Sequence, residues 1–346
     1  MAINRIEIKD FLVFKGEFAA DFCHGVNVII GGNATGKTTL LKTMYGIINY
    51  KLPSCFYANS IKDGVSYGNG SIKLFCGAEV SIDFNQGVFN EDSLVHPLTG
   101  KIQKVGAGMS SYITQGPHEA SRLSFENQSV YIPEKEMLSH SPGMLALKHE
   151  RSTVPFDDTL TDIIAKAQLY PKKEAYGNPL CSKIREIIGG EVAYDNDSFI
   201  IVKDRGKDEV TFSMEASGYR KLGLLWKLLR NGLLEPGTIL FWDEPENSLN
   251  PELIPTLADI LLELSRNGVQ IFIATHSYDV ARWFELNKSD GNILRYFNMR
   301  KENVGIVADV ADDYASLTNS VIEDAGNQLL RRVTEIAAIN AGVKLK

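Results

Sequence analysis

The chain has 346 residues, which is enough for one large domain or two ordinary ones. Hydrophobic residues make up 44% and charged residues 23%, a composition typical of a globular protein with ample material for a core. The net charge of −7 excludes a protein that coats nucleic acid by charge alone, although it leaves a local basic patch open.

The first residues lack the apolar stretch of a signal peptide, and no uninterrupted apolar run approaches the roughly 18 residues that span a bilayer. The cysteines lie far apart and form no C-x-x-C pair. We therefore expect reduced, buried thiols and no zinc site. These features predict a cytoplasmic protein with no membrane contact.

The N-terminal part of the chain is predicted to be rich in strands. Residues 3–22 indicate a hairpin, and 26–30 indicate a buried strand because the run is short, apolar and β-branched. A helix is expected over 37–49, ending before Pro53.

The next segment alternates between strands and turns. Residues 71–76 and 79–84 alternate in polarity around Gly77-Ala78 and predict an antiparallel hairpin. Residues 106–111 are small and predict a loop, whereas 128–132 predict a short strand that ends at Pro133.

The middle of the chain, residues 134–190, is expected to be helical and irregular. Helices are predicted over 159–169 and 183–188, the second closed by Gly189-Gly190. No heptads are sustained here, which excludes a long coiled-coil arm. A hairpin of residues 198–202 and 209–212 then leads to a helix that begins at Ser217-Gly218.

The C-terminal part begins with an apolar strand over 238–242. Asn250 is expected to cap a helix with Pro251 at its first position, and Gly268 to close it before a strand over 269–274. This strand–helix–strand order predicts a largely parallel sheet. A final helix is expected over 322–341; it could dock on the body of the protein or on a partner, and the body is favoured.

The residues Gly31–Thr38 fit the pattern G-x-x-x-x-G-K-[ST] between a predicted strand and a predicted helix. Glycines allow the backbone N–H groups to turn toward a phosphate chain, and the helix N-terminus adds its positive dipole end. Lys37 supplies a charge for the β- and γ-phosphates, and the Thr38 hydroxyl can bind Mg²⁺. The pattern predicts a binding site for ATP and Mg²⁺.

A second motif, Ile239–Glu244, is an apolar strand that ends in two carboxylates. Asp243 is expected beside the Mg²⁺ ion, and Glu244 where it can polarise the attacking water. Adjacent acids at a strand end are also common in solvated turns, but the phosphate loop upstream favours the functional interpretation.

Four segments resemble the motifs of ABC-type ATPases of the AAA class, in their family order. Residues 243–251 look like the Walker B motif and D-loop, and Thr275-His276-Ser277 like the switch histidine. Residues 214–221 look like the signature motif of the RecF, SMC-head and OLD-like branch, and 6–14 like its first strands. Tyr219 and Arg220 replace the glycine and glutamine of the transporter signature, which indicates the non-transporter branch.

This resemblance implies an α/β P-loop fold, an ABC-ATPase head with a mixed sheet, antiparallel N-terminal strands and a helical lobe. It implies one head over 1–346, with lobe I at 1–135 and 236–310, a helical insertion at about 136–235 and a C-terminal helix at 318–343. Glu134 takes the place of the Q-loop glutamine, where it could reach a metal ion.

The resemblance also implies the roles of individual residues. Glu244 and His276 would be catalytic, and Ser217-Gly218 would cap the γ-phosphate of ATP held by a second copy, with Asn247 and Ser248 facing that copy. The expected Mg²⁺ ligands are Thr38, Asp243 and Glu134. The expected nucleotide-binding residues are Asn33, Ala34, Thr35, Gly36, Lys37, Thr38, Thr39, Ser217 and Gly218.

Three functions compete. The first is an ATPase that forms a homodimer, or a higher oligomer, around ATP and gates a separately encoded effector, a nuclease or toxin, in phage defence; residues 278–346 are too few for a nuclease domain of ordinary size. The second is a RecF-like repair ATPase that binds DNA through basic residues. The third, a transporter subunit, is disfavoured by the signature. The basic candidates are Lys101, Lys104, Arg122, Lys172 and Lys173.

Overall fold

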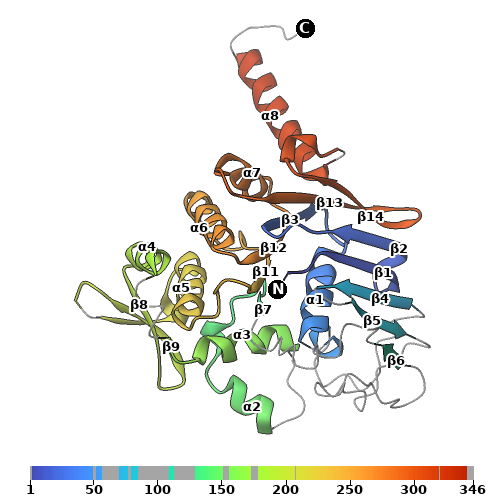
Figure 1. The fold of residues 1–346 in the computed structure, drawn as a ribbon. Helices are drawn as coiled ribbons and strands as arrows, with labels where there is room; N and C mark the ends of the chain where they lie inside the picture. Colours follow the sequence, from blue (N-terminus) through green and yellow to red (C-terminus); the bar gives the residue numbers. More distant parts are fainter. Residues whose placement is uncertain are drawn as a thin grey trace.

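The computed structural model describes residues 2–49, 52–56, 70–76, 79–84, 109–112, 129–150, 156–172, 178–206, 208–318 and 320–340. Three sheets and the helices around them make up this part of the chain (Figure 1).

The central sheet has the strand order β14-β13-β3-β12-β11-β7. All neighbouring strands are parallel except β13 and β14, which form an antiparallel hairpin. The predicted parallel arrangement of the strands on either side of residues 250–268 is therefore confirmed. The strands are β3 (Val26–Gly31), β7 (Ser129–Ile132), β11 (Ile239–Asp243), β12 (Gln270–Thr275), β13 (Leu294–Glu302) and β14 (Gly305–Ala311).

The second sheet is antiparallel, with the order β2-β1-β4-β5-β6, and confirms both predicted N-terminal hairpins. The loop predicted over 106–111 is wrong for 109–111, which lie in β6; residues 106–108 lie outside the described residues. The sequence of β6 has little strand propensity of its own. It is extended because the edge of β5 supplies partners for its backbone hydrogen bonds. The strands are β1 (Arg5–Phe11), β2 (Phe14–Asp21), β4 (Gly70–Phe75), β5 (Glu79–Phe84) and β6 (Met109–Tyr112).

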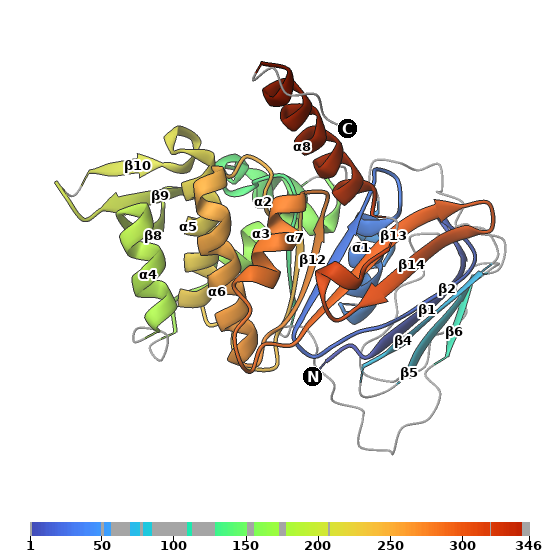
Figure 2. The same ribbon diagram turned by 90° about the horizontal axis from the view of Figure 1, so that it is seen from above.

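The third sheet contains the predicted hairpin of β9 (Ser198–Lys203) and β10 (Glu209–Thr211). It also contains β8 (Gly190–Asp195), which pairs with β9 and was not predicted. The segment before β8 was expected to be helical up to Gly190. Gly189 ends the preceding helix in a left-handed conformation with φ +67°, and the chain turns there directly into β8. The helical region therefore also carries a small sheet (Figure 2).

The predicted helices are present, but two of them begin elsewhere, and the helix Tyr278–Leu286 was not predicted. Asn250 caps the 3₁₀ turn Pro251–Leu253, and the α-helix expected from Pro251 begins at Ile254. Helix α4 begins at Pro179 rather than at residue 183, because Asn178 caps it by accepting a hydrogen bond from the Leu180 N–H. The α-helices are α1 (Lys37–Ile48), α2 (Met144–Glu150), α3 (Asp158–Gln168), α4 (Pro179–Ile188), α5 (Ser217–Arg230), α6 (Ile254–Arg266), α7 (Tyr278–Leu286) and α8 (Val321–Asn340). Short 3₁₀ turns are η1 (Pro53–Cys55), η4 (Leu138–His140), η6 (Phe212–Met214), η7 (Pro251–Leu253) and η8 (Tyr314–Ser316).

Two apolar cores lie on opposite faces of the central sheet. In β11, Leu240 and Trp242 pack into the core shared with α3 to α7, whereas Phe241 packs into the core shared with α1 and the antiparallel sheet. Successive side chains of a strand point to opposite faces, so a strand covered on both sides must be apolar throughout. The two layers fix the carboxyl ends of β3, β11 and β12 at one edge.

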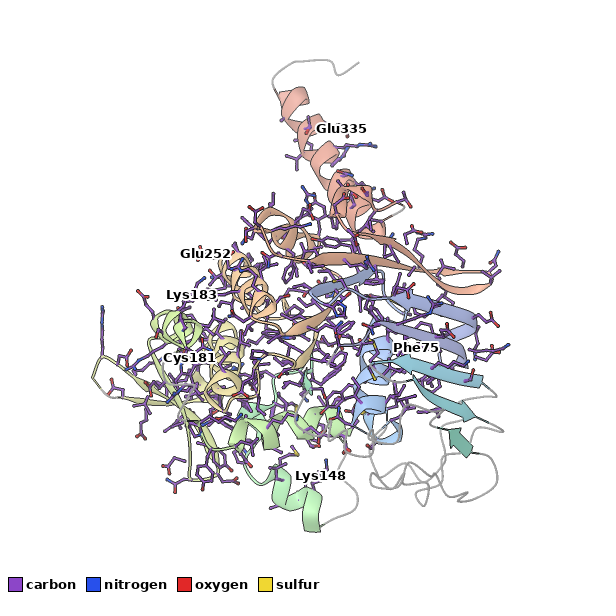
Figure 3. All side chains as sticks on the ribbon, in the orientation of Figure 1. Phe75, Lys148, Cys181, Lys183, Glu252 and Glu335 are labelled. Atoms are coloured by element: carbon purple, nitrogen blue, oxygen red, sulfur yellow. The ribbon has the colours of Figure 1, made fainter. Side chains whose placement is uncertain are left out.

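Helix α8 projects from the body in both views, and Figure 3 shows Glu335 on its projecting part. All described side chains between residues 327 and 337 are exposed. The expectation that this helix docks on the body is therefore wrong beyond its first turns. The chain enters α8 from η8 at the edge of the body, and the helix axis leads away from the sheet from there.

No helix among the described residues has the length and apolar character to cross a bilayer.

Candidate functional site

The loop between β3 and α1 has the backbone geometry of a phosphate-binding loop. Gly31 has φ +147°, and a methyl group there would lie 2.4 Å from the Met299 carbonyl oxygen. Gly36 has φ +91° and precedes the first residue of α1. Both positions require glycine, because side chains are strained at such φ values. The loop therefore presents its backbone N–H groups and the α1 N-terminus on the same side.

Lys37 lies inside this loop and is only 7% exposed. Its Nζ donates hydrogen bonds to the carbonyl oxygens of Gly31 (2.9 Å) and Gly32 (3.0 Å). Burial lowers the pKa of Lys37, and the charges of Glu244 and Asp243 oppose this shift. Of the other predicted nucleotide-binding residues, Thr35 is buried, Thr39 half-buried, and Asn33 and Ala34 exposed.

Asp243 at the end of β11 lies directly against the start of α1. Its Oδ1 accepts a hydrogen bond from Thr38 Oγ1 (3.1 Å), and its Oδ2 accepts one from the Tyr131 hydroxyl (3.2 Å). Burial raises the pKa of Asp243 to about 6, although both hydrogen bonds favour the ionised form. A hydroxyl and a carboxylate side by side are the hard oxygen ligands that Mg²⁺ prefers, so the two residues fit this ion.

Glu244 and His276 are brought together from the ends of neighbouring strands. His276 Nδ1 lies 3.1 Å from Glu244 Oε1, and the ring is half exposed. Glu244 has φ +46°, and its N–H donates to the Ala274 carbonyl oxygen (2.8 Å), so the turn after β11 is held against β12. This geometry can hold a water beside a carboxylate and an imidazole, which the predicted catalytic roles require.

Glu134, the third predicted metal ligand, contacts a different group. Its Oε1 accepts a hydrogen bond from Asn247 Nδ2 (2.7 Å). Within the described part of the chain, no recorded contact joins it to Thr38 or Asp243. The structure thus brings two of the three predicted ligands together and places Glu134 beside the segment expected to face a second copy.

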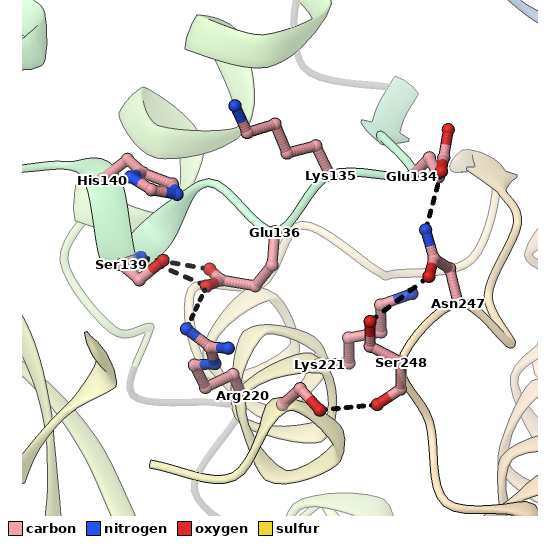
Figure 4. Close-up of a pocket in the computed structure, with 10 residues that line it drawn as sticks. Glu134, Lys135, Glu136, Ser139, His140, Arg220, Lys221, Asn247 and Ser248 are labelled. Carbon is pink, nitrogen blue, oxygen red and sulfur yellow. Dashed lines mark hydrogen bonds and ion pairs between the residues drawn. The ribbon is translucent and has the colours of Figure 1, made fainter. Parts of the chain in front are cut away.

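Ser217 is the first residue of α5 and borders a polar cavity of about 430 Å³ (Figure 4). Its Oγ donates a hydrogen bond to the Ser248 carbonyl oxygen (2.6 Å), and Gly218 is buried against Leu249 and Leu253. The hydroxyl is therefore at the surface while the glycine packs inside. The cavity is lined by Glu134, Lys135, Glu136, Ser139, His140, Ser217, Arg220, Lys221, Asn247 and Ser248.

Lys221 connects this cavity with the turn that follows β11. Its Nζ donates hydrogen bonds to the carbonyl oxygens of Glu244 (3.1 Å) and Pro245 (3.3 Å). The sequence did not single out Lys221, Tyr131 or Glu246 for these positions. Only the strand order places Tyr131 beside Phe241, and no spacing in the sequence reveals that neighbour.

Comparison with known proteins agrees with this geometry. The model of the family described as "AAA domain, putative AbiEii toxin, Type IV TA system" matches residues 104–281, about half of the chain. An uncharacterised ABC transporter ATP-binding protein, YybJ of Bacillus subtilis, is 29% identical over 138 residues, which are 39% of this chain and 60% of that protein. RecF of Lactobacillus gasseri, a DNA replication and repair protein, is 30% identical over 147 residues, 42% of this chain and 33% of RecF.

These alignments span only part of the relatives, at most about three fifths of their length. Among solved structures, an SMC head bound to the C-terminal winged-helix domain of ScpA matches 91% of this chain and 99% of its own, with a TM-score of 0.56 and 12% identity. The similarity concerns the fold. It confirms the predicted class, an α/β head with a mixed sheet and antiparallel N-terminal strands.

Proposed function

This chain belongs to the AAA-domain family of the AbiEii type and is an ABC-type ATPase of the non-transporter branch, and we propose that two copies enclose ATP and gate a separately encoded effector. The observation that carries the proposal is the 3.1 Å contact of Glu244 with His276, beside the loop that holds Lys37. The reaction is the hydrolysis of ATP to ADP and phosphate in the presence of Mg²⁺. We propose a single head with the lobes described above, in the cytoplasm.

Phosphate binding, metal binding and activation of the water are assigned to different residues of this chain. The backbone N–H groups of residues 33–39 and Lys37 would bind the phosphates, and Thr38 and Asp243 would hold Mg²⁺. A bound Mg²⁺ would supply positive charge to offset the charge that develops on the phosphates. Glu244 would accept a hydrogen bond from the attacking water, with the His276 ring beside that carboxylate. Glu134 is the third proposed ligand of this ion, and its Oε1 accepts a hydrogen bond from Asn247 in the structure.

The dimer is supported by the position of Ser217. Its side chain is half-buried at the N-terminus of α5, a helix of fourteen residues, where a phosphate can approach the backbone N–H groups. Within the described residues it contacts Ser248 and not the phosphate loop of its own chain. A nucleotide bound to the phosphate loop of one copy would then contact Ser217 of the other copy. A higher oligomer could be built from such dimers.

The effector is proposed to be a nuclease or toxin, and the setting to be defence against phage. The family description, which names a toxin of a type IV toxin–antitoxin system, supports this setting.

Glu244→Gln tests the ATPase mechanism. We expect ATP turnover to fall by at least about 100-fold, the usual contribution of a positioned general base, while ATP affinity is retained. Dimers should then accumulate in ATP, as measured by light scattering after size exclusion. Lys37→Ala is the control and should lose nucleotide binding and dimers alike. Undiminished turnover in Glu244→Gln would reject the mechanism.

A RecF-like role in DNA binding is the second candidate, and the similarity to RecF favours it. Of the basic candidates, Lys172 forms an ion pair with Glu235 (2.9 Å), whereas Lys101, Lys104, Arg122 and Lys173 lie outside the described residues. If the chain binds duplex DNA through phosphates, affinity must fall steeply between about 50 and 200 mM salt. Binding that is absent at low salt, with and without ATP, rejects this role.

A further inference from the structure

A third acidic side chain, Glu246, lies next to the Glu244–His276 pair and has no role so far. It is only 10% exposed, and its Oε1 accepts hydrogen bonds from Thr275 Oγ1 (2.5 Å) and from the His276 backbone N–H (3.2 Å). Its Oε2 is buried and, within the described part of the chain, has no hydrogen-bond partner. Burying a carboxylate is costly, so this placement calls for a reason.

Thr275 directs Glu246 toward the histidine. The Thr275 hydroxyl is fully buried and accepts a hydrogen bond from the Ser277 N–H (2.9 Å), so its own proton is available for Glu246. Glu246 is thereby attached to the turn after β12, although it belongs to the turn after β11. Burial lowers the pKa of Lys221, and of the acids that oppose this shift Glu246 contributes most.

Two carboxylates therefore lie near the same ring nitrogen of His276. Its Nδ1 is 3.1 Å from Glu244 Oε1 and 3.6 Å from Glu246 Oε1. An ionised carboxylate only accepts hydrogen bonds, so Nδ1 must carry the proton and Nε2 of the neutral ring is an acceptor. The first separation fits a hydrogen bond and the second is too long for one, so the ring must move toward Glu246 before its N–H can donate there.

We propose that Glu246 is a positioning residue that takes over the Nδ1–H of His276 and so frees Glu244 to accept a hydrogen bond from the attacking water. This inference rests on the proposed ATPase function. A single N–H cannot donate a full hydrogen bond to both carboxylates, and Glu244 cannot hold water well with the oxygen that His276 occupies. No proton leaves the ring in this exchange; only the acceptor changes.

Glu246→Gln tests the proposal with little change of shape. The amide oxygen can still accept from Thr275 and from the His276 N–H, while the negative charge beside Nδ1 is removed. We expect kcat to fall about 10- to 100-fold, as for residues that orient a catalytic group, with KM for ATP within about twofold. Thr275→Val removes the anchoring hydroxyl and should lower kcat in the same manner, whereas Thr275→Ser keeps the hydroxyl and serves as the matched control.

The ring tautomer supplies a readout that is independent of turnover. In ¹⁵N-labelled protein the His276 signals, assigned with His276→Gln, should show the proton on Nδ1 in the wild type. In Glu244→Gln the proton should stay on Nδ1 because Glu246 accepts it, and it should shift toward Nε2–H only when Glu246→Gln is added. A shift toward Nε2–H in Glu244→Gln alone overturns the proposal, as does unchanged kcat in Glu246→Gln. If the wild type hydrolyses no more ATP than Lys37→Ala, the proposed function fails, and the tautomer alone decides the role of Glu246.

Discussion

The buried charge of Lys221 lowers the stability of the fold, while its hydrogen bonds hold part of the candidate site in place. It is 4% exposed, and burial lowers its pKa to about 8, although four nearby carboxylates act in the opposite direction. Its hydrogen bonds to the carbonyl oxygens of Glu244 and Pro245 fix the turn after β11 to the helix that begins at Ser217. A charged group in this position couples the two motifs within one chain.

The pKa of Lys221 predicts a pH dependence of stability. Below about pH 8 the lysine is charged in both states, and the folded state carries the full cost of burial. Between about pH 8 and 10.5 the folded protein loses the proton first, so the unfolded state binds more protons and stability rises with pH. The shift from 10.5 to about 8 corresponds to about 3 kcal/mol.

Lys221→Met should remove this rise. Urea unfolding between pH 7.5 and 10 measures the free energy of unfolding of both proteins, and their difference isolates the contribution of Lys221. Parallel curves over this range would show that the lysine does not titrate with a lowered pKa.

At the scale of elements, helix α3 supports the helix of the phosphate loop. Asp157 caps α3 by accepting a hydrogen bond from the Thr159 N–H, and its other oxygen lies 2.6 Å from Lys42 Nζ on α1. Both charged side chains are mostly buried, so the pair is stronger than one at the surface. The Tyr45 hydroxyl adds a hydrogen bond from α1 to Asp162 (2.9 Å). Helix α1 is therefore held from a segment far along the chain.

Two substitutions at Asp157 separate the cap from the ion pair. Asp157→Asn keeps a capping oxygen and should lower the free energy of unfolding by about 2 kcal/mol, between the values for exposed and buried pairs. Asp157→Ala also removes the cap and should lose about 1 kcal/mol more. Chemical denaturation measures both. Equal losses would mean that the cap contributes nothing.

At the scale of the whole molecule, the two cores place the residues of the candidate site at one edge of the central sheet, whereas α8 projects from the body. Val333 (56% exposed) and Ile336 (47% exposed) lie one turn apart on the projecting part of this helix. An isolated helix of this length is marginal in water, so its stability depends on packing that the described residues of one chain do not provide.

The double substitution Val333→Ser and Ile336→Ser should therefore leave the melting transition of the head unchanged. Exposed substitutions usually alter stability by less than about 0.5 kcal/mol. Differential scanning calorimetry measures the transition, and Leu261→Ser in the buried face of α6 provides the contrast of a core substitution, with a loss of several kcal/mol. A clear loss of stability in the α8 variant would show that the helix folds back onto the head.

Local signals were sufficient for much of the fold. The glycine and lysine pattern at residues 31–38, the apolar strand before Asp243, and the Asn250-Pro251 start were all visible because each depends on neighbours within a few residues. Strand β8 was missed because its only strong signal is its pairing with β9. The exposure of α8 was missed because a helix pattern does not state what covers the helix.

The same distinction between local signals and tertiary contacts applies to the candidate site. The sequence by itself determined the phosphate loop, the acidic strand end and the order of the motifs, since bond geometry and side-chain chemistry act over short spans of chain. Only the tertiary structure decided that His276 Nδ1 lies near both Glu244 and Glu246, that Tyr131 donates a hydrogen bond to Asp243, and that Glu134 contacts Asn247. These contacts join residues distant in the chain, and they exist because parallel strands packed between two cores end at a common edge.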